Sequence, residues 1–72
     1  MPDTAVIAAK VTQLKEHLAT KGVTEISIDT QCRFLAGMSV PLFTRNKVRQ
    51  LSGFGVCEHQ RYSDIKAVLQ QL

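Results

Sequence analysis

Four apolar residues near the start of the chain follow one another at intervals of four, three and four, the spacing of one face of an α-helix: Ile7, Val11, Leu14 and Leu18. Asp3 or Thr4 stands before this stripe as a helix N-cap, and Gly22 stands after it where a helix would end. The stripe predicts an amphipathic helix over 4–21. Because the chain has only 72 residues, we expect one domain over 1–72, near the lower size limit for folding without disulfides, metals or a partner.

The next segments predict a short strand and a brief helix. EISID at 25–29 alternates apolar and polar residues, as a half-buried strand does. TQCRFLAGM at 30–38 follows it and predicts a second helix that buries Phe34, Leu35 and Met38.

The second half of the chain predicts two more helices with a short extended piece between them. Pro41 suits the first turn of a third helix over 41–52, because its missing N–H is not needed there. VCEHQRY at 56–62 predicts one extended piece or two very short strands. Ser63 is placed to cap a last helix. Four apolar residues of that helix fall at the spacing of one helical face: Ile65, Val68, Leu69 and Leu72.

With this order of elements the chain resembles the winged helix-turn-helix superfamily of DNA-binding domains, of the small excisionase-like or phage and plasmid regulator type. ISIDTQCRFLAGMSVP is similar to the strand, second helix and turn, VRQLSGFGV to the end of a recognition helix, and RYSDIKAVLQQL to the final segment. The resemblance implies a mainly α fold with a small β component, in the order helix, strand, helix, helix, short wing, helix. It also implies that the third helix enters the DNA major groove.

Positive charge is concentrated in the middle of the chain. The formal net charge is +3, but residues 30–62 contain five cations, four of them arginine, against the single acid Glu58. Arginine forms paired hydrogen bonds with phosphate and guanine, so a polyanion is the first partner to consider. Arg45 and Arg49, four residues apart, would project from one helical face toward adjacent base pairs. The full predicted DNA-facing set on this helix is Thr44, Arg45, Lys47, Arg49 and Gln50.

Four residues outside the third helix are further candidates for DNA contact. Arg33 on the second helix and Ser39 before the turn could hold phosphates. His59 and Arg61 lie where a wing tip would approach the DNA backbone or minor groove. Each candidate also has a purely structural interpretation. The cationic face of the third helix could simply be solvated, the hydroxyls of Ser39 and Thr44 could cap a helix, and Arg33 could be a solvent-exposed arginine.

These features predict a sequence-specific double-stranded DNA-binding protein, either a transcription regulator such as a repressor or a recombination accessory factor. It would act by occupying its site as a homo-oligomer, with RNA polymerase or a recombinase as a further partner. The expected dimer contacts are in the first or last helix, with Ala5, Ala8, Ala9 and Leu72 as candidates. The alternative function is a non-enzymatic protein-interaction module or inhibitor that docks the same cationic helix on an acidic partner.

We expect no enzyme activity, cofactor or metal. The sequence has no phosphate-binding glycine loop, no nucleophile elbow and no separate carboxylate pair. Cys57 and His59 share a strand face, and Cys32 and His17 would complete a four-ligand zinc set by number. However, no paired metal-ligand spacing is present.

The sequence also predicts a cytoplasmic protein without a membrane partner. The start, MPDTAVIAAK, lacks a basic segment followed by an apolar run, and no stretch of about 18 apolar residues occurs. In such a chain Cys32 and Cys57 are expected to be reduced core thiols.

Overall fold

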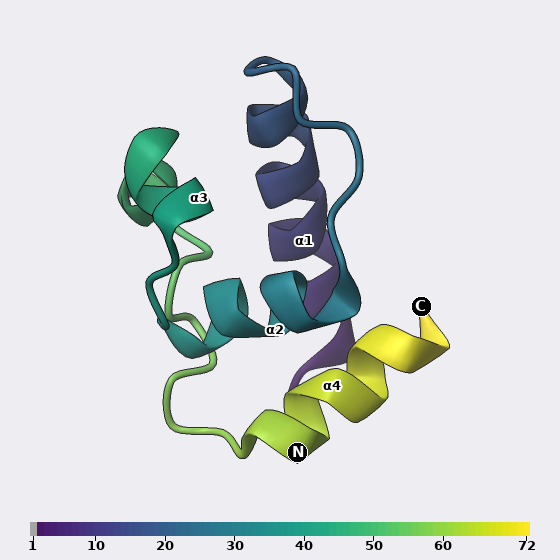
Figure 1. Ribbon diagram of the computed structural model, residues 1–72. Coiled ribbons are helices and arrows are strands. Elements are labelled where there is room, and N and C mark those ends of the chain that lie inside the picture. The colour runs from purple at the N-terminus through teal and green to yellow at the C-terminus, as the bar shows by residue number, and fades with distance from the viewer. Residues whose placement is uncertain (1) are drawn as a thin grey trace.

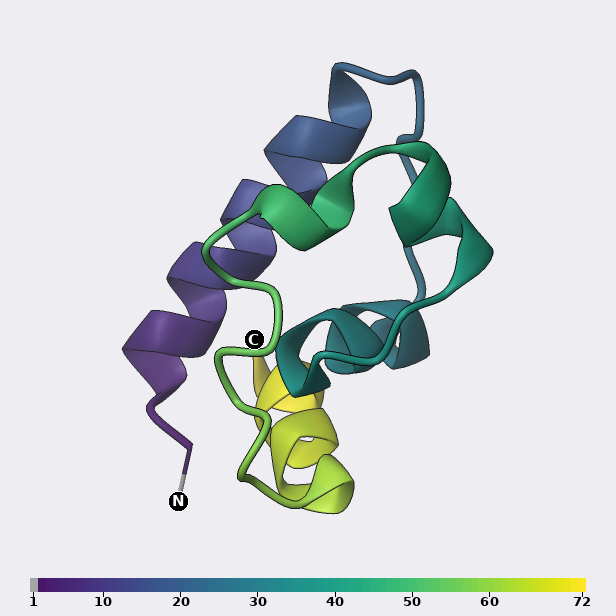
Figure 2. The same cartoon turned by 90° about the vertical axis from the view of Figure 1, so that its left-hand side faces the viewer.

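The computed structural model describes residues 2–72, which form helices joined by turns (Figure 1). The elements in chain order are α1 Thr4–Ala19, α2 Ile28–Ala36, α3 Pro41–Arg45, the 3₁₀ helix η1 Val48–Gln50, and α4 Tyr62–Gln71. α2 packs against both α1 and α4, while α3 and η1 lie next to each other. Figures 1 and 2 show α3 toward one end of the molecule and the start of α4 at the other.

α1 forms as its sequence predicts. The Asp3 carboxylate accepts hydrogen bonds from the N–H groups of Ala5 and Val6, at 2.9 and 3.2 Å. Asp3 therefore satisfies two of the N–H groups that have no partner within the first turn of a helix. Gly22 follows the helix with φ of +81°, a conformation that favours glycine. All four residues of the apolar stripe are buried: Ile7, Val11, Leu14 and Leu18.

The predicted strand at 25–29 is absent, because α2 begins inside it. The Ser27 hydroxyl accepts a hydrogen bond from the N–H of Thr30 at 3.1 Å and caps a helix that starts at Ile28. This N-cap outweighs the alternation of Ile26 and Ile28, since residues 2–72 provide no second strand to pair with the segment.

α2 ends at a glycine in the left-handed conformation. Gly37 has φ of +77°. The N–H of Met38 donates to the Arg33 carbonyl at 2.8 Å, and that of Gly37 donates to the Phe34 carbonyl at 3.1 Å. This pair of bonds is the Schellman motif, which satisfies carbonyls of the last helical turn. Met38 leaves the helix with 47% of its surface exposed, so its predicted burial is wrong.

Consecutive turns over 51–60 replace the predicted wing. Within them the N–H of Gly55 donates to the Phe34 carbonyl at 2.9 Å, and the N–H of Cys57 donates to the Leu35 carbonyl at 2.8 Å. These carbonyls belong to the last turn of α2, where the C=O groups have no N–H partner within the helix. The segment therefore completes the end of α2 instead of pairing as a strand. The predicted β component and winged order are wrong for the described part of the chain.

Three aromatic rings from three segments meet in the core. Phe34 of α2, Phe43 of α3 and Phe54 of the turns lie edge to face, with ring centroids 6.1 to 6.3 Å apart. Gly53 is buried beside them, and a Cβ there would lie 2.8 Å from both the Phe34 ring and the Lys10 side chain. Edge-to-face aromatic contacts stabilise a fold by more than the area they bury accounts for. This cluster therefore stabilises the packing of the second half of the chain against α2.

The last helix follows its prediction in part. α4 begins at Tyr62, so Ser63 lies within the helix and is not its cap. Ile65 and Leu69 are buried as expected. Leu72 is 59% exposed, which leaves it accessible as the candidate dimer contact named above.

Cys32 and Cys57 are both free and buried, as expected of core thiols. Burial is the main cause that raises the pKa of each thiol above its ordinary value. The His, Cys, Asp and Glu side chains of residues 2–72 form no group of three or more that could hold a metal ion. No helix in this part of the chain is long and apolar enough to cross a membrane.

Candidate functional site

The predicted recognition helix over 41–52 is interrupted. α3 ends at Arg45, and Lys47 adopts the left-handed conformation with φ of 57° before η1 begins. Phe43 and Val48 are both fully buried. Five residues of continuous helix would separate their directions by about 140°. The interruption lets both side chains reach the core, so one long recognition helix is incompatible with this packing.

Asn46 and His17 hold the interruption in place. The Asn46 side-chain amide donates to the Leu42 carbonyl at 2.8 Å, which satisfies a carbonyl at the end of α3. His17 Nε2 of α1 donates to the Asn46 carbonyl at 2.7 Å. Sequence reasoning missed this role of His17, because its partner is a backbone group 29 residues away.

The DNA-facing residues predicted on the third helix all remain exposed: Thr44, Arg45, Lys47, Arg49 and Gln50. They do not share one helical face, because Arg45 ends α3 and Arg49 belongs to η1. The Arg49 guanidinium lies 5.8 Å from the Phe54 ring centroid, within cation–π range. The expectation that Arg45 and Arg49 project from a single helix is therefore wrong.

Ser39 and Thr44 come together at the turn between α2 and α3. Their hydroxyl oxygens lie 3.5 Å apart, and both residues are exposed. Val40, at the N-cap position of α3, offers no side-chain hydrogen bond to the helix. One of the two hydroxyls donates to the other, which leaves one O–H at this turn free to donate to an anion beside α3.

Arg33 lies beside a polar network that joins α2 to α4. The Tyr62 hydroxyl donates to Asp29 at 3.1 Å, and Lys66 pairs with the same carboxylate at 3.2 Å. These bonds, the Lys66 bond first, lower the pKa of Asp29. Burial raises the pKa of Tyr62, and the Arg33 side chain opposes that rise. Arg33 thus lies close to this junction.

His59 and Arg61 lie away from the candidates on α3 and η1. They precede α4, which begins at the end of the molecule opposite α3 (Figures 1 and 2). His59 is 3.5 Å from Glu58, and both side chains are largely exposed. With turns in place of a wing, these two residues do not extend the surface of α3 and η1.

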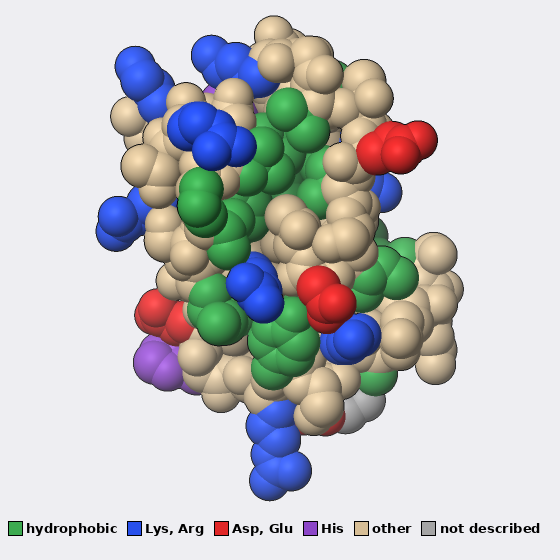
Figure 3. All heavy atoms as spheres, viewed as in Figure 1, with side chains coloured by type: hydrophobic (Ala, Val, Ile, Leu, Met, Phe, Trp, Pro, Cys, Tyr) green, Lys and Arg blue, Asp and Glu red, His purple; other side chains and the backbone are tan. Residues whose placement is uncertain are grey.

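Charge on the middle of the chain is one-sided. Residues 30–57 contain no Asp or Glu. The ion pairs found within residues 2–72, His59 with Glu58 and Lys66 with Asp29, involve none of the cations in this stretch. Figure 3 shows Lys and Arg side chains gathered over α3 at the upper left, where no acidic side chain is visible. The cations of this stretch are Arg33, Arg45, Lys47 and Arg49.

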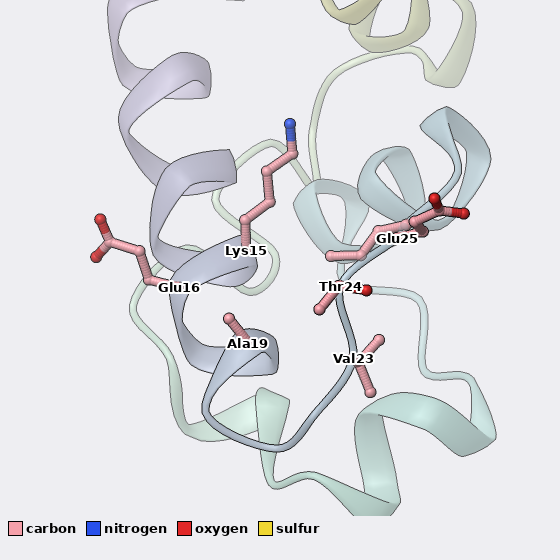
Figure 4. A pocket seen from close by; sticks show the side chains of 7 residues that line it. Lys15, Glu16, Ala19, Val23, Thr24 and Glu25 are labelled. Atoms are coloured by element: carbon pink, nitrogen blue, oxygen red, sulfur yellow. The ribbon is translucent and has the colours of Figure 1, made fainter.

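A surface hollow beside α1 has no catalytic arrangement. It lies between α1 and residues 23–26 and has a volume of about 630 Å³ (Figure 4). Ala19 and Val23 line its apolar part. The carboxylates of Glu16 and Glu25 point away to opposite sides, so they cannot act as a pair on one substrate atom.

Comparison with known protein families, curated proteins and solved structures finds no match to this chain. No relative therefore supports the resemblance to winged helix-turn-helix domains. Any function must be inferred from the described surface itself, and its most distinctive part is the run of three unpaired cations at residues 45–49, here called the cationic segment.

Proposed function

We propose that this chain binds double-stranded DNA through the cationic segment. The observation that carries the proposal is that Arg45, Lys47 and Arg49 are exposed, without an ion-pair partner in residues 2–72, on a stretch free of acids. A surface of this kind attracts a polyanion, because releasing counterions from DNA favours each phosphate contact. The hydrogen-bonded hydroxyl pair of Ser39 and Thr44 adds one phosphate donor beside it.

The short α3 favours a binding mode dominated by phosphate contacts. Its five residues span roughly 7.5 Å, too little to carry several base-reading side chains along a groove. Arg45 is the arginine at its end, and it carries the proposed sequence preference. Arg49 lies in η1, outside α3, with its guanidinium near the Phe54 ring. In this position it would contact a phosphate next to the site read by Arg45. Occupancy of a preferred site would then serve a regulatory or recombination-accessory role.

The proposal is tested by fluorescence anisotropy on a random duplex and on a sequence selected from a random library, over a series of salt concentrations. Lys47→Ala should weaken binding to both duplexes equally and reduce the salt slope by about one unit. Arg45→Ala should cost about 1–3 kcal/mol on the selected sequence and less on random duplex. Arg49→Ala should behave like Lys47→Ala.

Arg61→Ala is the matched control, since it removes an exposed arginine at the far end of the molecule. It should leave affinity and salt slope unchanged. A wild-type protein that does not bind duplex DNA at low salt would rule out the proposal.

The interruption at Lys47 favours a second candidate, docking of the cationic segment on an acidic protein surface. A protein partner does not require a helix long enough to read the major groove. Arginines at the edge of an interface also pair readily with carboxylates of a partner protein. Failure to bind any duplex, with retained binding to a polyglutamate chain that Lys47→Ala weakens, would favour this candidate.

A further inference from the structure

Two adjoining hollows lie between α1 and α4, on either side of Leu72. The first has a volume of about 360 Å³ and is lined by residues that include Ala8, Lys15 and Ile28. The second has a volume of about 290 Å³ and is lined by residues that include Thr4 and Asp64. Leu72 borders both. We call the two hollows together the α1/α4 groove.

The middle of the α1/α4 groove exposes apolar side chains beside the polar Thr12 and Gln31. Leu72 is 59% exposed and Ile28 is 37% exposed. Ala8 of α1 lines the same hollow with a small side chain. Val11 and Leu69 form part of the floor and also belong to the core. These apolar side chains are therefore exposed to water, on a protein whose hydrophobic core is small for its surface.

The two ends of the groove carry opposite charges. Lys15 lies eleven residues beyond Thr4 along α1, a distance of about 16 Å. Asp64 shares the second hollow with Thr4, so it lies at the opposite end from Lys15. Neither side chain forms an ion pair within residues 2–72. The groove thus runs from a positive end through a partly apolar middle to a negative end.

We propose that the α1/α4 groove is the interface of a homodimer in which the second copy is related by a two-fold axis near Leu72. A two-fold axis reverses the groove end to end, so Lys15 of each copy meets Asp64 of the other and Leu72 meets Leu72. When a second copy lies on the groove in the reversed direction, the positive end of each copy therefore faces the negative end of the other. Burying the apolar middle also stabilises a small core by mass action.

This interface is independent of DNA binding. In Figures 1 and 2, α3 and α4 lie toward opposite ends of the molecule. Dimerisation through the groove would leave both cationic segments exposed. The dimer can consequently be measured without DNA, and its failure would not contradict the proposed function.

The test is sedimentation equilibrium of the purified chain at low salt. Lys15→Glu and Asp64→Lys should each place like charges together twice per dimer and raise the dissociation constant at least tenfold. An equimolar mixture of the two variants should dimerise again, because every Lys15–Asp64 position then pairs opposite charges. The double variant Lys15→Glu/Asp64→Lys should also recover the wild-type constant. Lys21→Glu makes the same charge change outside the groove and should have no effect.

Circular dichroism checks that each variant is folded, and Leu72→Glu provides a second way to block the apolar middle at an exposed position. Loss of dimer in Leu72→Glu and recovery in the mixture support the proposal. A wild type that is monomeric at millimolar concentration would overturn it. Charge-reversed variants that dimerise as well as the wild type, or a mixture that stays monomeric, would overturn it as well.

Discussion

α1 and the segment from Pro41 to Ser52 both begin with good helix signals, but only α1 continues. α1 has an Asp3 cap, and α3 has Pro41 in its first turn. The apolar residues of α1 recur at intervals of four, three and four, whereas the interval from Phe43 to Val48 is five. The comparison teaches that start signals decide where a helix begins, while the spacing of buried residues decides how far it runs.

The second segment also depends on α1 for its shape. His17 donates to the Asn46 carbonyl at 2.7 Å, and Gln13 accepts the N–H of Gly53, the residue after the segment, at 2.9 Å. Both side chains lie outside the apolar stripe of α1. The long helix therefore supplies polar partners as well as apolar surface, and these partners contact the break between α3 and η1 and the end of the segment.

The largest effect is expected where the interrupted segment enters the core. Phe43→Ala should reduce the free energy of unfolding by about 3–5 kcal/mol, because the ring is fully buried between Phe34 and Phe54. Urea unfolding measures this loss. Thr44→Ala, at the exposed next position, should change stability by no more than about 0.5 kcal/mol. Equal effects at the two positions would mean that the segment does not pack as described.

An intermediate effect is expected at the link between the two regions. His17→Ala should cost about 1–3 kcal/mol, because the Asn46 carbonyl loses its donor in a partly buried site. Thermal unfolding compares this variant with Glu16→Ala, an exposed neighbour on α1 that should be nearly neutral. If the two variants were equally stable, the link would contribute nothing to the interruption.

The smallest effect is the most direct test of the comparison. Lys47→Gly should leave stability unchanged or raise it by up to about 1 kcal/mol, since glycine adopts the left-handed conformation without strain. Arg45→Gly, within α3, should lower stability by about 1 kcal/mol. Denaturant midpoints of the two variants give the signs. A similar loss at both positions would show that the helix runs through residue 47.

The candidate site was predictable in composition but not in arrangement. The exposure of Arg45, Lys47 and Arg49 follows from their charge, and the structure agrees. Their distribution over α3 and η1 does not follow from the sequence, because it depends on where Phe43 and Val48 are buried. The separation of His59 and Arg61 from α3 likewise depends on the path of the turns over 51–60.

The sequence by itself determined the features that act over a few residues. The Asp3 cap and apolar stripe of α1, the place of Pro41 at the start of α3 and the burial of the two thiols needed no knowledge of distant neighbours. Each follows from local hydrogen bonding or from side-chain hydrophobicity.

Only the tertiary structure decided between extended and turn conformations. EISID at 25–29 alternates as a strand does, but a strand needs a partner for its backbone hydrogen bonds. In the structure α2 begins at Ile28, so the second half of this stretch is helical. Residues 55 and 57 donate their N–H groups to the end of α2, a requirement created by a helix about 20 residues earlier in the chain. At the interruption before η1, the Asn46 carbonyl accepts a hydrogen bond from His17 of α1. In each case the deciding partner is remote in sequence, so local pattern alone could not reveal it.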